Sequence, residues 1–192
     1  MLKSNGNKRK RQMLKVAIVG NIASGKSTVE QVIEDNGFKV YDTDKIAHEI
    51  LESSNEVLKE FGTIDRKEIA KIVFSNSKKL QLLESIIHPK VKEEILKIFD
   101  CEENFVFVSV PQLFEAGFES MFDKILYITA DENLRKERLI KRNNFTPEEA
   151  QKRIDVQNNA GKAEKADFVI KNNSTIDELN TQVEKILSIL IR

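Results

Sequence analysis

The sequence has few of the residues on which several classes of protein depend. Its 192 residues include one cysteine, Cys101, which excludes an internal disulfide framework and a zinc site built from cysteines. Its two histidines disfavour a histidine-rich metal site. No apolar run approaches the roughly 20 residues that span a bilayer, and no apolar segment follows the basic N-terminus as it does in a signal peptide. We therefore expect a cytoplasmic protein without a membrane partner.

An excess of charge of one sign is also absent. Lysine and arginine together number 31, and so do aspartate and glutamate, which gives a formal net charge of zero. Because nucleic-acid binding needs a net or clustered positive field, we expect no nucleic-acid partner. Five of residues 1–12 are basic. We predict that they form a flexible tail, an upstream extension before Met13, with a nucleic-acid or membrane arm as the alternative.

Residues 13–192 are enough for one compact domain, and they alternate short apolar segments with helical patterns. The predicted strands are 14–19, 38–41, 105–110, 125–129 and 168–170. The predicted helices are 26–35, 44–60, 66–100 in pieces, 131–142, 147–158 and 176–191. This alternation implies an α/β fold with a parallel sheet covered on both faces. The strandless interval 44–104 predicts a helical insertion, in which Pro89 should divide the long helical stretch.

A phosphate-binding loop follows the first predicted strand. The segment Gly20-Asn-Ile-Ala-Ser-Gly25-Lys26-Ser27 matches the pattern G-x-x-x-x-G-K-[ST], between a strand and a helix. Glycine at both fixed positions lets successive N–H groups point at phosphate oxygens, and the helix adds the positive end of its dipole. Lys26 is expected to reach the β and γ phosphates and the Ser27 hydroxyl to ligate Mg²⁺. The loop predicts binding of a nucleoside triphosphate.

The use made of the triphosphate depends on the rest of the chain. The Asn-Lys-x-Asp motif that specifies guanine is absent, which disfavours a GTPase, and the chain is short for a motor or a large ATPase. A small kinase fits, and it requires an acceptor site, a base and mobile arginines over the γ phosphate. An ATP-binding regulatory module is the non-enzymatic alternative.

Two aspartates follow the second predicted strand. Asp42 and Asp44 stand two residues apart at a strand end, where ligands bind in the crevice of an α/β sheet. Either could instead be the N-cap of the following helix, since aspartate is favoured there. The residues alone leave open which of the two is catalytic and which is the cap.

With these aspartates included, residues 14–190 resemble the dephospho-CoA kinase family. The matching motifs occur in order and at compatible spacing. They are Asp42-Thr-Asp44, Asp65-Arg66, Leu83-Glu84, His88-Pro89, Pro111-Gln-Leu-Phe-Glu115, Arg138-Leu-Ile-Lys-Arg142, Thr146 with Ala150 and Arg153, and Gln157 with Lys162 and Ala166-Asp-Phe-Val-Ile-Lys-Asn172.

The resemblance implies a fold and a reaction. The fold is a three-layer α/β/α P-loop kinase with a five-stranded parallel sheet. Its implied parts are a core of 13–44, 101–137 and 160–192, a helical acceptor-binding insertion over 45–100, and a helical lid over 138–159. The implied reaction transfers the γ-phosphoryl group of ATP, with Mg²⁺, to the 3′-hydroxyl of dephospho-CoA. Another small-molecule kinase of this fold, acting on a nucleoside, a nucleotide or a shikimate-like acceptor, is the alternative.

The resemblance also implies roles for individual residues. The catalytic set is Asp44, Lys26 and Arg142. ATP is expected to contact Asn21, Ile22, Ala23, Ser24, Gly25, Lys26, Ser27, Thr28, Arg138, Arg142 and Asn172. The acceptor is expected to contact Asp42, Asp44, Arg66, His88, Glu115 and Arg153, and Mg²⁺ to be held by Ser27 and Asp42. The residues alone leave simpler roles open. Arg138 and Arg142 could lie on a solvated helix face, and His88 could pack before Pro89.

The chain departs from the family pattern at four positions. Asn21 and Ala23 stand where the family usually has glycine, but asparagine tolerates left-handed backbone angles and alanine is small, so the loop can still form. Ser109 stands where the family usually has an acidic residue, which puts more weight on the two aspartates after the second strand. Gln112 replaces an apolar residue, and nothing in the sequence explains it.

Overall fold

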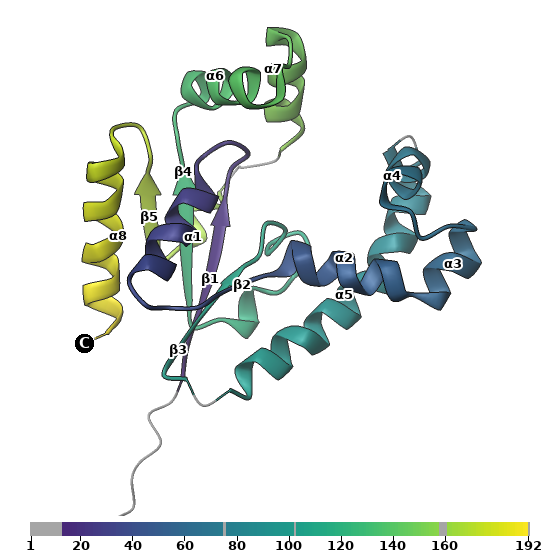
Figure 1. Ribbon diagram of the computed structural model, residues 1–192, viewed down its shortest axis with the longest axis horizontal. Helices are drawn as coiled ribbons and strands as arrows, with labels where there is room; N and C mark the ends of the chain where they lie inside the picture. The colour runs from purple at the N-terminus through teal and green to yellow at the C-terminus, as the bar shows by residue number, and fades with distance from the viewer. Residues whose placement is uncertain (1–12, 75, 102, 158–160, 192) are drawn as a thin grey trace, which may run out of the picture.

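The computed structural model describes residues 13–191 except 75, 102 and 158–160, so the tail predicted over 1–12 lies outside the described residues. Five strands form one sheet in the order β2-β3-β1-β4-β5, and every neighbouring pair is parallel. The strands are β1 (Leu14–Gly20), β2 (Val40–Asp42), β3 (Phe105–Ser109), β4 (Lys124–Thr129) and β5 (Phe168–Lys171). The predicted α/β class and the five parallel strands are therefore confirmed (Figure 1).

Eight helices accompany these strands within the described part of the chain, seven of them between strands and the last after β5. They are α1 (Lys26–Asp35), α2 (Thr43–Ser53), α3 (Asn55–Phe61), α4 (Arg66–Phe74), α5 (Ser77–Phe99), α6 (Glu132–Asn143), α7 (Pro147–Val156) and α8 (Ile176–Leu190). Two short 3₁₀ turns are η1 (Glu119–Met121) and η2 (Ala163–Lys165).

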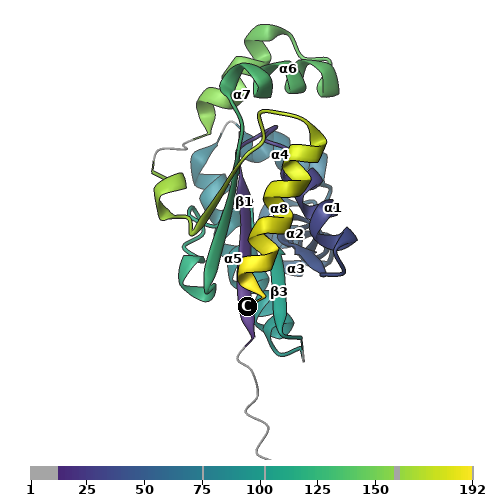
Figure 2. The same ribbon diagram turned by 90° about the vertical axis from the view of Figure 1, so that its left-hand side faces the viewer.

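Alternate residues of the central strand supply two separate cores. Val16 and Ile18 of β1 point to the face that α1 and α8 cover, and these two helices pack against each other (Figure 2). Ala17 and Val19 point to the opposite face, which is covered by α5 and by the segment between β3 and β4. Because side chains alternate across a strand, a fully apolar β1 requires cover on both faces, and this produces the three layers.

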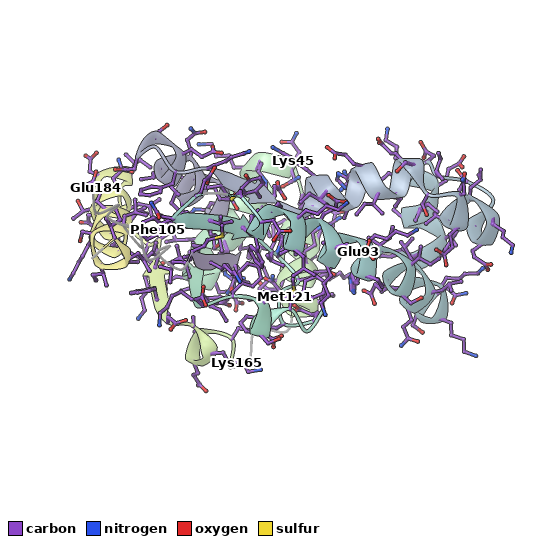
Figure 3. The ribbon with its side chains drawn as sticks, turned by 90° about the horizontal axis from the view of Figure 1, so that it is seen from below. Lys45, Glu93, Phe105, Met121, Lys165 and Glu184 are labelled. Carbon is purple, nitrogen blue, oxygen red and sulfur yellow. The ribbon has the colours of Figure 1, made fainter. Side chains whose placement is uncertain are left out.

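The four helices α2 to α5 extend from one side of the sheet (Figure 1). Seen from below, the α5 residue Glu93 lies on the side of these four helices, and the α8 residue Glu184 lies at the opposite end of the molecule (Figure 3).

The helix predicted over 44–60 is in fact two helices, because the Ser54 side chain accepts a hydrogen bond from the backbone N–H of Val57 and caps α3. The strandless insertion is confirmed as helical.

The prediction that Pro89 divides the long helical stretch is wrong. Helix α5 runs without interruption from Ser77 to Phe99, with Pro89 inside it. Ile86, Ile87 and Val91 are buried on either side of the proline. Burial of this apolar stripe stabilises the helix by more than the backbone hydrogen bond that the proline removes.

Helices α6 and α7 form a pair above the carboxyl ends of the strands (Figure 1). Thr146 and Glu149 make a complete capping box at the start of α7, which fixes the turn between the helices. Leu139, Ala150 and Ile154 form the buried core of the pair. The partly buried Ile22 and Ala23 of the phosphate loop pack against this small core, so the pair is in direct contact with the loop.

We predict that Phe107→Ala lowers the free energy of unfolding by about 3–5 kcal/mol, the usual cost of truncating a buried phenylalanine. Phe107 is 1% exposed, and its ring lies 5.5 Å from that of Phe38 in an edge-on arrangement. Phe74→Ala is the matched control, because that ring is 94% exposed and its loss should change stability by about 0.5 kcal/mol or less. Urea unfolding followed by circular dichroism measures both, and equal effects would contradict this assignment of the core.

Candidate active site

The phosphate loop joins the end of β1 to the start of α1 and requires glycine at position 25. Gly25 has a φ of +91°, in the left-handed region that favours glycine. A Cβ atom at this position would lie 2.1 Å from the side-chain nitrogen of Asn172. Any larger residue would therefore collide with a side chain that arrives from the end of β5.

Carbonyl oxygens of the loop are hydrogen-bonded from outside the loop. The Arg138 guanidinium donates to the carbonyls of Ala23, at 3.3 Å, and Ser24, at 3.4 Å. The Asn172 side chain donates to the Ser24 carbonyl at 2.8 Å, and the backbone carbonyl of Asn172 accepts from Arg138 at 2.9 Å. The N–H groups of the first turn of α1, at Lys26 and Ser27, have no partner within the helix and can bind an anion.

The two departures from glycine in the loop are accommodated differently. Ala23 takes the left-handed conformation, with a φ of 58°, where its small side chain keeps the strain low. Asn21 does not have a positive φ. It is buried, and its side-chain oxygen accepts a hydrogen bond from the hydroxyl of Tyr127 on β4. The asparagine therefore ties the loop to the sheet, a role that its tolerance of left-handed angles did not predict.

Lys26 begins α1 and carries the central positive charge of the loop. Its ammonium group lies 2.7 Å from a carboxylate oxygen of Glu30 and 2.5 Å from the hydroxyl of Ser109 at the end of β3. The sequence reasoning missed Glu30, although its spacing of four residues from Lys26 places both side chains on one face of α1. The neighbouring Ser27 is exposed.

Asp42 and Asp44 have different positions at the end of β2. Asp42 is the N-cap of α2, because its carboxylate accepts from the backbone N–H of Asp44 at 2.9 Å. Asp44 keeps contact with solvent, but the protein around it removes water from part of its carboxylate. This desolvation first, and the negative charge of Asp42 second, raise the pKa of Asp44, while Lys26, His48 and Arg66 oppose the rise.

Two cavities meet at Asp44. The larger, of about 1260 Å³, lies between the phosphate loop and the pair α6–α7. The smaller, of about 280 Å³, lies among the helices of the insertion. Three residues line both cavities, namely Asp44, Glu84 and Gln112. A group bound in one cavity can therefore meet a group bound in the other at this carboxylate.

The predicted contact residues divide between the cavities. The whole phosphate loop, Asn21 to Thr28, lines the larger cavity together with Glu115, Arg138, Arg142, Arg153 and Asn172. Arg66 and His88 line the smaller cavity. His88 also meets the ring of Phe118 edge-on at 6.0 Å, so it packs and faces the cavity at once. Asp42 lines neither cavity.

Two further residues that matched the family pattern have contacts in the site. The Gln157 side chain accepts from the backbone N–H of Ile22 at 2.7 Å. Lys162 is 8% exposed, and its ammonium donates to the Glu115 carboxylate at 2.5 Å. Both follow α7 in the sequence, so they link the helical pair to the phosphate loop and to the segment after β3. Sequence reasoning matched these residues but gave them no role.

A phosphate loop that opens to a large cavity, beside a second cavity with a shared carboxylate, defines a P-loop kinase of small molecules. The family model for dephospho-CoA kinase matches residues 14–178, and the chain belongs to this family. A dephospho-CoA kinase from Fusobacterium nucleatum is 40% identical over 183 residues, which cover 88% of this chain and 95% of that protein.

Solved structures agree with this assignment. A dephospho-CoA kinase from Campylobacter jejuni superposes with a TM-score of 0.71 and 32% identity, over 91% of this chain and 95% of that one. A Thermus thermophilus protein superposes with a TM-score of 0.82 and 30% identity, over 93% of this chain and 98% of that one.

None of the helices described here is both long and apolar enough to cross a membrane.

We predict that Asp42→Asn lowers the pKa of Asp44. The amide keeps an oxygen that can cap α2 but removes the negative charge that favours protonation of Asp44. Because the native pKa of Asp44 is raised, its charge is lost earlier as pH falls, and the variant should hold that charge to lower pH. A carbon-13 NMR titration of the side-chain carboxyl carbons measures the shift. Asp35→Asn, on an exposed residue of α1, is the control, and an unchanged Asp44 titration in Asp42→Asn would contradict the coupling.

Proposed function

We propose that this chain transfers the γ-phosphoryl group of ATP to the 3′-hydroxyl of dephospho-CoA and forms coenzyme A. The observation that carries this proposal is the position of Asp44, which lines both the phosphate-loop cavity and the cavity of the insertion. Family membership supplies the identity of the two substrates. The geometry supports Asp44 as the place where their reacting atoms meet.

The larger cavity takes ATP. The N–H groups at the start of α1 bind the phosphates, and Lys26 exchanges its present partners for phosphate oxygens. Positioning and charge neutralisation supply most of the catalysis, because phosphoryl transfer passes through a loose transition state. Arg142, exposed on the rim of this cavity, is placed to approach the transferring group.

The residues at the loop suit Mg²⁺ held together with the nucleotide. Ser27 offers an exposed hydroxyl at the start of α1, and Asp44 offers a carboxylate in the same cavity. The described residues contain no cluster of three or more acidic, histidine or cysteine side chains that could hold a metal alone. This donor set fits Mg²⁺, which usually combines one or two protein ligands with substrate phosphates and water. Bound there, the ion neutralises charge on the phosphates. We assign the role of Mg²⁺ ligand to Ser27 and not to Asp42, because the Asp42 carboxylate caps α2.

The smaller cavity takes the acceptor. Its walls are mainly apolar, with Leu51, Ile69 and Val73 among them, and Arg66 and His88 add polar groups. Asp44 orients the acceptor hydroxyl and takes its proton late in the transfer, and its raised pKa makes the carboxylate a stronger base. The insertion, residues 45–100, is in this proposal the acceptor-binding part of the chain.

The helical pair, within the proposed lid of residues 138–159, covers the nucleotide. Arg138 holds the phosphate loop from behind, and Arg153 stacks 4.5 Å from the ring of Phe145 while facing the same cavity. Asn172 also acts on the loop, through its hydrogen bond to Ser24. Closure of the pair over the bound substrates excludes water and limits hydrolysis of ATP.

Lys26→Ala should reduce turnover of dephospho-CoA below about a tenth of the wild-type rate, because the removed charge acts on the phosphates. Asp44→Asn should lower kcat by about 10²-fold, the lower end of the range for a general base, since a loose transition state asks little of it. A coupled ADP-release assay measures both rates. Lys45→Ala and Glu49→Gln, on exposed residues of α2, are the matched controls (Figure 3 labels Lys45).

The same assay with other acceptors tests the choice of substrate. Dephospho-CoA should be phosphorylated far faster than adenosine, nucleoside monophosphates or shikimate. A faster rate with any of these acceptors would contradict the proposed function, and so would full activity of Asp44→Asn.

A further inference from the structure

Strand β3 ends in a neutral side chain at the phosphate site. Ser109 is fully buried, and its hydroxyl contacts the Lys26 ammonium at 2.5 Å. The strand end therefore reaches the lysine that is expected to bind the phosphates, but it brings no negative charge.

A carboxylate from another element binds the same ammonium. Glu30 lies one helical turn after Lys26 on α1, and its carboxylate oxygen is 2.7 Å from the lysine nitrogen. Ser109 and Glu30 thus meet at one atom of Lys26 although they come from β3 and α1. The negative charge missing from the strand end is present next to it, supplied by the helix.

The surroundings make this charge matter to a ligand. The side chains of Lys26 and Glu30 are only 22% and 16% exposed. An exposed ion pair of this spacing contributes little to stability, because water and salt screen its charges. In a partly buried site solvent screens charge less, so a carboxylate beside the phosphate-binding lysine acts on any phosphate bound there.

We propose that Glu30, the carboxylate beside Lys26, makes the site select metal-bound over metal-free ATP. The carboxylate repels the four negative charges of free ATP, and it attracts a divalent cation carried by the phosphates. The proposal rests on the proposed function, since it requires that ATP occupies the phosphate loop. Glu30 is a selectivity residue that acts through charge, whereas a tether for Lys26 would affect both forms of ATP alike.

Calorimetric titration of ATP, with excess Mg²⁺ and with EDTA, measures this selectivity as the ratio of the two dissociation constants. Glu30→Gln should bind metal-free ATP more tightly by a factor on the order of ten, the effect of one unit charge several ångströms away in a partly solvated site. Affinity for Mg²⁺-ATP should change less, so the ratio should fall. Glu34→Gln, one turn further along α1 and exposed, makes the same change in net charge and should leave the ratio unchanged.

Placing the charge on the strand end instead of the helix provides the rescue. Ser109→Asp in the Glu30→Gln background should restore much of the ratio, because the carboxylate returns beside Lys26. Ser109→Asp alone should raise the ratio above that of the wild type, and this variant tests the proposal even if Glu30→Gln does not fold. A ratio unchanged in Glu30→Gln, or equal losses of both affinities, would show a tether and overturn the proposal. Wild-type turnover of dephospho-CoA, measured separately, tests the proposed function independently.

Discussion

The phosphate loop keeps its shape because other elements bind its carbonyl oxygens from behind. Arg138 on α6 donates hydrogen bonds to the carbonyls of Ala23 and Ser24, and Asn172 after β5 donates to that of Ser24. A carbonyl oxygen that faced the bound anion would repel it, because both carry negative charge. Because the oxygens are engaged elsewhere, the N–H groups at the start of α1 face the ligand. Nucleotide binding therefore depends on residues distant from the loop in the sequence.

The parallel sheet places the phosphate loop next to the cavity of the insertion. The carboxyl ends of the parallel strands lie at one edge of the sheet, so the loop, Asp44 and Asn172 line one cavity. The buried Ser109 contacts Lys26 of the loop. Asp42 ends β2 and caps α2, the helix that carries Asp44 in its first turn. The Asp44 carboxylate then lines two cavities. Desolvation first, and the negative charge of the helix cap Asp42 second, raise its pKa.

Much of this arrangement could be predicted from the sequence, for physical reasons. The loop pattern and the apolar runs depend on local chemistry, and both were found where the residues indicated. Two kinds of feature escaped. Pro89 lies inside α5 because burial of neighbouring isoleucines outweighs a local preference. The Tyr127 contact to Asn21 depends on which side chains meet in space and belongs to no sequence pattern. Glu30 could have been found from its spacing of four residues to Lys26, but that spacing does not reveal that Ser109 meets the same ammonium.

A structure of the chain with dephospho-CoA and a non-hydrolysable ATP analogue tests the central claim, that Asp44 joins the two substrates. The account predicts the analogue in the cavity of the phosphate loop and the acceptor in the insertion. It also predicts the acceptor 3′-hydroxyl within hydrogen-bond distance of the Asp44 carboxylate and in line with the terminal phosphate. An acceptor bound elsewhere, or a hydroxyl held by a different side chain, would contradict it.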